Sequence, residues 1–302
     1  MEILEYRPDL LSEVAALYNR ATARVPHCYP VAAGDLGALL AGGDRERDAQ
    51  KTWVARDGQA LVGMIHALSE AAPDSAVGDD PDRAPQSAIR FLWHERDRRA
   101  AGQALLETAQ QWLQQQRPGP IWACRASDRY WFYHFKNAFL SDHLDHVGAL
   151  LQLNGYRKAA GEVVMDWPEF PEREPVEVDL DFVIQVRAEP QSRGDRQATL
   201  IQALVEGEGA GQCILRSGGE YSRDPDALSW AFIDWLGVRD EYQGLGLGKH
   251  LLQRGLNEMR LIGHRHACIT TAWDNYRAFV LYTHFGFQVV DWTYGLRRDP
   301  DD

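Results

Sequence analysis

The stretch EYQGLGLGKHLL, residues 241–252, places three glycines at alternate positions directly before an apolar helical pattern. An apolar strand pattern at 230–238 precedes it, and Leu252, Leu256 and Met259 follow at helical spacing. The glycines therefore stand where a strand turns into a helix N-terminus. Free N–H groups and the helix dipole attract anions there, and missing β-carbons let a phosphate approach the main chain. The pattern predicts a phosphate-binding turn; the alternative is a tight turn that needs glycine for geometry alone.

Two common phosphate-binding motifs do not fit this stretch. A P-loop needs Ser or Thr after its Gly-Lys pair and a glycine five residues before that pair, but His250 and Gln243 stand there. A dinucleotide fingerprint needs a glycine three residues after its second glycine, where Lys249 follows Gly246. The pattern that remains is Gln243-x-x-Gly246-x-Gly248.

A second group of residues with fixed spacing follows further along the chain. The segment Asn275-x-x-Ala278-x-x-Leu281-Tyr282-x-x-x-Gly286-Phe287 carries an amide and a phenol. Together the two motifs resemble the GNAT superfamily of acyl-CoA-dependent N-acyltransferases, whose diphosphate-binding signature is (Arg/Gln)-x-x-Gly-x-(Gly/Ala). The resemblance covers residues 230–290.

This resemblance implies acetyl-CoA as co-substrate. In the family, the strand before the glycines splays from its neighbour and binds the pantetheine arm, while the amides of the turn hold the diphosphate. Asn275 would hydrogen-bond the pantetheine arm from the start of the next helix. The residues that match these roles are Leu236, Gly237, Val238, Gln243, Gly244, Leu245, Gly246, Leu247, Gly248, Lys249 and Asn275.

The resemblance also places Tyr282 near the sulfur, where it would donate a proton to the departing thiolate. A thioester already has a good leaving group, so an amine needs mainly positioning, deprotonation and stabilisation of the oxyanion. A backbone N–H near Val238 would supply that stabilisation. The alternative for Tyr282 is a half-buried aromatic on an amphipathic helix.

Asp234 is the predicted general base. Side chains alternate along a strand, so Phe232, Asp234, Leu236 and Val238 are expected to share one face. Phe232 stands at the position where the family commonly carries an acidic residue. A structural ion pair is the alternative for Asp234, and other candidate bases on the preceding hairpin are Glu206, Glu208 and Glu220.

The order of elements repeats along the chain. Strand, turn, strand, strand and helix follow one another at 52–116 and again at 198–262, and each half closes on a Gly-aromatic pair, at 155–156 and 286–287. A polar loop at 71–87 interrupts the first copy. The repeat predicts an α/β (α+β) fold with two GNAT-like domains, each a mixed, mostly antiparallel sheet flanked by helices.

The stretch WPEFPEREPVE holds three prolines and four glutamates and is the best linker candidate. We therefore predict an N-terminal domain at 1–167, a linker at 168–177 and a C-terminal catalytic domain at 178–302. Between the linker and the hairpin that begins the second copy there is little room for the helices that wall the acceptor site in the family. The first domain is expected to help close that site, an architecture similar to tandem-domain members such as mycothiol synthase.

The first copy has lost the predicted chemistry. Aligning 100–106 with 246–252 leaves it without equivalents of Gly246 and Gln243. An alternative register, Arg99-x-x-Gly102-x-Ala104, matches the signature formally but shifts the apolar face of the helix. Counting back from the Gly-aromatic pair finds neither an amide nor a phenol. The counterparts are Ala100, Asp97, Leu144 and Leu151. This half also carries an aromatic, histidine-rich insertion at 125–146, which suits either a ligand pocket or domain interface, or core aromatics beside a surface loop.

Composition limits the partners. A net charge of -12 argues against nucleic acid and suits a cationic amine, either a small molecule or a peptide. Four scattered cysteines without a CxxC pair predict neither a zinc site nor disulfides, so no metal is expected. No apolar run reaches membrane-spanning length, which predicts a cytoplasmic protein that does not bind membranes. A monomer and a homodimer both stay open.

The predicted function is the transfer of an acetyl (acyl) group from acetyl-CoA to an amine by direct attack in a ternary complex. The alternative from another class is a non-catalytic acyl-CoA-binding regulatory or assembly module. A third possibility is an unrelated nucleotide-binding enzyme.

Overall fold

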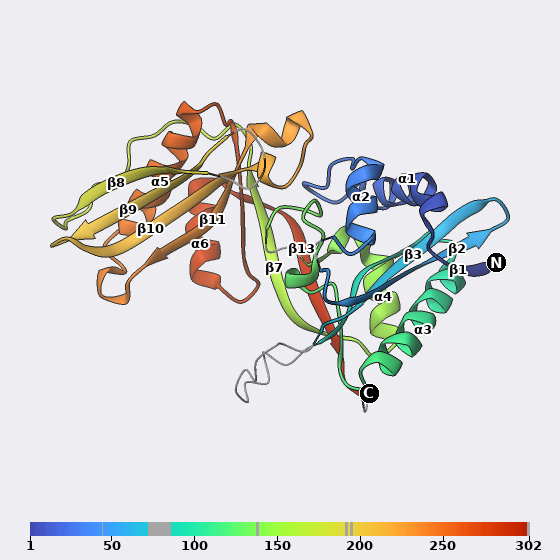
Figure 1. The fold of residues 1–302 in the computed structure, drawn as a ribbon. Helices are drawn as coiled ribbons and strands as arrows, with labels where there is room; N and C mark the ends of the chain where they lie inside the picture. Colours follow the sequence, from blue (N-terminus) through green and yellow to red (C-terminus); the bar gives the residue numbers. More distant parts are fainter. Residues whose placement is uncertain (44, 72–85, 137–138, 191–192, 194–195, 301–302) are drawn as a thin grey trace. The chain divides into compact units, whose positions relative to one another are not determined.

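The computed structural model describes residues 1–302 except 44, 72–85, 137–138, 191–192, 194–195 and 301–302. Most of the predicted polar loop at 71–87 lies outside the described residues. The chain forms two compact units (Figure 1). Unit 1 comprises Met1–Tyr133, Asn137–Glu162 and Trp292–Asp302, and unit 2 comprises His134–Lys136 and Val163–Asp291.

Unit 1 is a mixed sheet with the strand order β1-β2-β3-β4-β5-β13. The pairs from β1 to β4 are antiparallel, and β4 and β5 are parallel. The strands are β1 (Glu2–Glu5), β2 (Ala49–Asp57), β3 (Ala60–Ser69), β4 (Ser87–His94), β5 (Ile121–Ala123) and β13 (Gln288–Arg298), with the short β6 (Leu140–Ser141) beside β13. The helices are α1 (Leu11–Thr22), α2 (Ala33–Leu40), α3 (Arg99–Gln116) and α4 (Asp145–Leu153).

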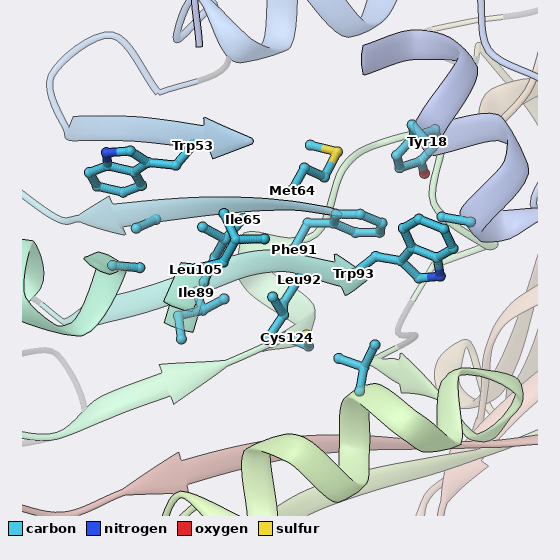
Figure 2. Packing of buried hydrophobic residues seen from close by; sticks show 14 of the residues in the cluster. Tyr18, Trp53, Met64, Ile65, Ile89, Phe91, Leu92, Trp93, Leu105 and Cys124 are labelled. Carbon is cyan, nitrogen blue, oxygen red and sulfur yellow. The ribbon is translucent and has the colours of Figure 1, made fainter. Parts of the chain in front are cut away.

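The core of unit 1 lies around β3 and β4. Both strands are buried almost throughout, because their sequences are nearly continuous apolar runs rather than alternating patterns. Figure 2 shows Ile65 and Leu92 from these strands close to Leu105 of α3. On the other side of the core, Tyr18 of α1 packs edge-on against Phe132 with the ring centroids 5.5 Å apart.

Unit 2 repeats this arrangement with the strand order β7-β12-β11-β10-β9-β8. Three antiparallel pairs from β8 to β11 are again followed by a parallel pair, β11 and β12. The strands are β7 (Arg157–Trp167), β8 (Val183–Glu189), β9 (Ala198–Val205), β10 (Glu208–Ser217), β11 (Trp230–Val238) and β12 (His266–Ala272), and the helices are α5 (Leu247–Leu261) and α6 (Tyr276–Phe285). The predicted mixed sheets and their internal duplication are confirmed.

In the described part of unit 2, no pair of helices precedes the hairpin as it does in unit 1. Unit 1 has α1 and α2 between β1 and β2, whereas β8 is followed directly by β9 in unit 2. In the described part of 168–205 there is no α-helix. This agrees with the expectation that the sequence has little room for helices there.

The predicted linker packs along α5 within unit 2. Phe170 is fully buried, the Asn257 side chain donates to the Arg173 carbonyl, and His250 Nδ1 lies 2.8 Å from the Val176 carbonyl. Strands β7 and β13 each contribute residues to both units. The division into domains at 1–167 and 178–302 stays a prediction.

Among the described helices, none is both long and apolar enough to cross a membrane.

Candidate functional site

The site begins where two parallel strands part. Residues Trp230–Ile233 of β11 pair with His266–Ile269 of β12. Among the described residues, β11 has no recorded pairing with β12 beyond Ile233. The predicted splay is therefore present, and main-chain groups of 234–238 on that side have no strand partner.

The turn after β11 exposes a row of amides. Gly244 and Gly246 have φ angles of 81° and 91°, in the left-handed region that favours glycine, and Gly246 is the N-cap of α5. The first amides of a helix have no intrahelical acceptor. No described residue is recorded as accepting from the backbone N–H groups of residues 244–249. The turn thus presents unused donors at the positive end of the α5 dipole.

Gln243 fixes the shape of this turn from its first position. Its Nε2 donates to the Val238 carbonyl over 3.0 Å and to Asp240 Oδ1 over 2.7 Å. Its Oε1 accepts from Arg277 Nη1 over 3.2 Å. The side chain therefore connects the end of β11 to the first turn of α6.

A second helix N-terminus converges on the same place. Asn275 is the N-cap of α6, and its side-chain oxygen accepts from the Ala278 N–H over 3.2 Å. For its side-chain NH₂ group no acceptor is recorded among the described residues. The oxygen shapes the helix start, which leaves the NH₂ group as the donor that could bind a ligand.

These elements enclose a pocket of about 450 Å³. Most of the predicted cofactor-binding residues and Tyr282 line it, from β11, the glycine turn and α6. The exceptions are Gly237, which lies against the Trp235 indole and lines a neighbouring pocket, and Leu245, which is exposed. The predicted residues that do line the pocket are Leu236, Val238, Gln243, Gly244, Gly246, Leu247, Gly248, Lys249, Asn275 and Tyr282.

The sequence prediction missed four lining residues, Tyr242, Arg277, Ala278 and Leu281. Ala278 and Leu281 belong to the second motif, so the signal for them was present. Arg277 stands between Asn275 and Ala278 at a motif position that allows any residue. With Lys249 it gives the pocket two cations, whereas no carboxylate is among its lining residues. The pocket is therefore locally suited to an anion although the whole chain is acidic.

Tyr282 reaches the pocket from α6 and is 6% exposed. Its ring packs edge-on against Phe287 with the centroids 5.9 Å apart, and Phe287 in turn packs against Trp167 at 5.4 Å. This aromatic packing restrains the phenol near the point where β11 leaves β12.

Asp234 lies elsewhere than predicted. The register of β10 against β11 skips it, so it forms a β-bulge between Ile233 and Trp235. By this register Phe232 pairs with Arg216, whereas Leu236 and Val238 pair with residues on the opposite face of β10. The expectation that Phe232, Asp234, Leu236 and Val238 share one face is wrong, because the bulge breaks the alternation.

Both carboxylate oxygens of Asp234 are engaged by cations. Oδ1 accepts from Lys136 Nζ over 2.6 Å, and Oδ2 accepts from Arg216 Nε over 2.8 Å. Taking a proton from an amine would remove the negative charge that holds both cations. The assignment of Asp234 as general base stays a prediction.

In unit 1 the region equivalent to this pocket is the start of α3, and side chains fill it. There the Ala101 N–H donates to the Arg98 carbonyl, whereas the amide at the matching position of α5, Lys249, has no recorded acceptor among the described residues. A β-carbon at Gly102 would lie 2.2 Å from the His94 ring, which fills the space beside the helix start. The Nε2 of His146 hydrogen-bonds the His94 carbonyl over 2.9 Å and holds this arrangement.

Comparison with known proteins agrees with the GNAT resemblance of the second half of the chain. Residues 162–287 match the model of the Acetyltransferase (GNAT) family. No curated protein sequence matches the chain significantly.

Similar solved structures cover the whole chain. A tandem GNAT protein from the clavulanic acid biosynthesis pathway is 16% identical with a TM-score of 0.67, and the alignment covers 99% of this chain and 98% of that one. A GCN5-related N-acetyltransferase from Sphaerobacter thermophilus is 16% identical with a TM-score of 0.62, with 99% and 95% covered. At this identity the likeness shows the fold, which is that of a tandem GNAT protein.

Proposed function

We propose that this chain, which carries an acetyltransferase (GNAT) domain at residues 162–287, transfers an acetyl group from acetyl-CoA to an amine. One observation carries the proposal. Two helix N-termini and the cations Lys249 and Arg277 converge on a pocket that opens where β11 parts from β12.

Different parts of the pocket suit the diphosphate, the pantetheine arm and the thioester of acetyl-CoA in turn. The unused amides of 244–249 and the two cations suit the diphosphate, which needs donors and positive charge. The main chain at 236–238, which has no strand partner on the β12 side among the described residues, and the Asn275 NH₂ group suit the amide-bearing pantetheine arm. The thioester would then lie beside Val238 and Tyr282, at the inner end of the pocket.

The reaction joins two substrates held together. The amine nitrogen attacks the thioester carbonyl carbon, a C–N bond forms, and the C–S bond breaks as the oxyanion collapses. The Tyr282 hydroxyl donates its proton to the coenzyme A thiolate, and the amine loses one proton to a base. A backbone N–H near Val238 would stabilise the oxyanion. In this proposal the C-terminal half performs the chemistry and the N-terminal half shapes the acceptor site.

The test measures binding and turnover separately. Calorimetry with acetyl-CoA, and with ATP and NAD as controls, tests whether the pocket prefers coenzyme A. Release of the free thiol is then followed with a panel of amines and peptides. Acetyl-CoA binding with amine-dependent thiol release supports the proposal. Binding without turnover for any amine supports the non-catalytic module, and tighter binding of ATP or NAD contradicts acyl transfer.

A further inference from the structure

A short segment of the histidine-rich insertion is built into unit 2. Residues His134–Lys136 belong to that unit, although the chain around them belongs to unit 1. Phe135 is fully buried, with its ring 5.5 Å from Tyr221 and 5.8 Å from Phe232. A β-carbon at Gly218 would lie 2.9 Å from the Phe135 ring, so glycine makes room for it there. The segment is thus anchored at the start of β11.

The anchored segment brings a cation to the bulge in β11. Lys136 and Arg216 both bind Asp234, which is buried with its side chain 4% exposed. The two cations are more open, with 44% of the Lys136 and 27% of the Arg216 side chain exposed. The buried carboxylate therefore holds two cations whose outer ends face solvent.

These cations keep donors that the described protein does not use. Arg216 binds Asp234 through Nε, and no further partner is recorded among the described residues for its Nη groups or for the remaining N–H groups of Lys136. The nearby carboxylate of Glu220 accepts from the Arg193 backbone N–H and also attracts Arg216 electrostatically. Two carboxylates therefore balance the two cations, and what the cluster offers a ligand is the N–H donors at the exposed ends of Arg216 and Lys136.

The cluster lies close to the predicted reacting atoms. Asp234 is two residues before Leu236 on β11, a separation of roughly 7 Å along a strand. Asp234 and Arg216 lie on the sheet face opposite Leu236, but β11 and β12 have already parted at this point, so the sheet is open there. The inference requires that a molecule bound at Arg216 extend between the parted strands toward the thioester.

We propose that Arg216 and Lys136 bind a carboxylate of the acceptor, so that the preferred substrate is an amine that also carries a carboxylate, as an amino acid does. The paired Nη groups of a guanidinium match the two oxygens of a carboxylate, and the ammonium of Lys136 adds charge. The proposal rests on the acetyltransferase function and reverses the expectation of a purely cationic acceptor, because two partly exposed cations with N–H donors lie beside the strand that would hold the thioester.

The experiment compares acceptors that differ by one carboxylate. Thiol release from acetyl-CoA is measured with ornithine and putrescine, tyrosine and tyramine, and histidine and histamine, while phosphoethanolamine and ethanolamine test phosphate in its place. In at least one carboxylate pair we expect kcat/KM to be tenfold or more higher for the amino acid. Turnover confined to amines without a carboxylate, a preference for phosphoethanolamine alone, or no turnover with any amino acid overturns the inference.

Variants separate ligand binding from structural anchoring. Arg216→Gln should raise KM for the amino acid and remove its advantage over the paired amine, while the Kd of acetyl-CoA changes less than twofold. Arg187→Gln, which removes an equal charge from an exposed position on β8, is the matched control and should keep the preference. If the ion pairs only anchor the segment, Arg216→Gln will lower the thermal midpoint and slow both members of each pair equally.

The two proposals fail differently. If acetyl-CoA does not bind or no amine is acetylated, the proposed function fails and this inference fails with it. If amines are acetylated without regard to a carboxylate, the inference about Arg216 and Lys136 fails and the acetyltransferase function stands.

Discussion

Tyr282 carries the most specific chemical role at the scale of single residues. Its ring packs edge-on against Phe287, which in turn packs against Trp167. Asp234 differs, since its two carboxylate oxygens accept from Lys136 and Arg216. We therefore propose Tyr282 as the acid, whereas Asp234 is better arranged to organise cations than to accept a proton.

Tyr282→Phe should lower kcat by about 10- to 100-fold, near the lower end of general acid effects because a thiolate leaves readily. The Kd of acetyl-CoA should change less than twofold, since the ring keeps its packing. Steady-state thiol release and calorimetry measure the two effects. Tyr276→Phe, on the same helix but 74% exposed, is the control and should leave kcat unchanged. An unaltered kcat in Tyr282→Phe would refute the acid role.

Asp234→Asn distinguishes an organising carboxylate from a base. We expect a higher KM for the acceptor, because Lys136 and Arg216 lose the charge that holds them, and an unchanged pH profile of kcat. Kinetics across pH 6 to 9 measure both. Loss of the acidic limb of that profile, with KM preserved, would instead support Asp234 as the general base.

At the scale of elements, the turn between β11 and α5 determines where an anion can bind. Its glycines differ in what they do: Gly246 takes a left-handed conformation, whereas Gly248, inside the first turn of the helix, does not. The family signature shows the same difference, since it requires glycine at the first position and accepts alanine at the second. The left-handed backbone explains why the first position requires glycine. Limited space beside Val238 explains why the second position accepts only glycine or alanine.

Gly246→Ala should weaken acetyl-CoA binding by about tenfold and lower the free energy of unfolding by about 1–2 kcal/mol, the cost of a left-handed conformation for an L-residue. Gly248→Ala is the matched control. Its β-carbon would meet Val238 at an ordinary contact distance of 3.6 Å, so both quantities should stay close to wild type. Calorimetry and chemical denaturation provide the values. Equal effects of the two substitutions would show that the left-handed turn is unimportant.

Sequence reasoning predicted the features that depend on neighbours in the chain. The strand–turn–helix order and both motifs are local, and they located most residues that line the pocket. The bulge at Asp234 depends on how β11 pairs with β10, and the anchored segment with Phe135 and Lys136 depends on contacts about 100 residues apart. Neither leaves a periodic pattern in the sequence, so both were missed.

At the scale of the whole molecule, the same arrangement of strands and helices occurs twice, but the two copies differ at the helix start where an anion would bind. Unit 2 keeps unused amides at the start of α5, whereas in unit 1 the Ala101 amide at the start of α3 has a carbonyl partner and the His94 ring fills the adjoining space. The units also depend on strands from distant parts of the chain, because the end of β13 pairs with β5 in unit 1. We therefore propose that one copy is catalytic and the other structural.

Calorimetric titration should find one acetyl-CoA per chain. Opening a second site in unit 1 would require displacing the buried His94 ring and freeing the Ala101 N–H from the Arg98 carbonyl. His94→Ala, which removes the ring, tests whether that ring alone blocks binding. It should still give one site, because the Ala101 amide remains paired and Ala100 and Asp97 replace the glycine and glutamine of the unit 2 turn. A stoichiometry of two in the wild type would contradict the proposed division of roles.

Truncation after Asp291 should destabilise unit 1 while sparing the pocket. It removes the residues that pair with β5, including Leu296, whose burial alone is worth about 1.5–3 kcal/mol. The thermal midpoint should fall, and the Kd of acetyl-CoA should change less than threefold because the lining residues lie in unit 2. Truncation after Asp299 is the control. If the chain truncated after Asp291 kept the wild-type thermal midpoint, the part of β13 that pairs with β5 would be dispensable for the stability of unit 1.

The central claim is that the start of α5 holds the diphosphate of an acyl-CoA. A crystal structure with acetyl-CoA tests it most directly. The account predicts diphosphate oxygens within hydrogen-bond distance of the amides between Gly244 and Lys249, with the thioester beside Val238 and Tyr282. A coenzyme bound in unit 1, or bound in unit 2 with its diphosphate away from these amides, would contradict it.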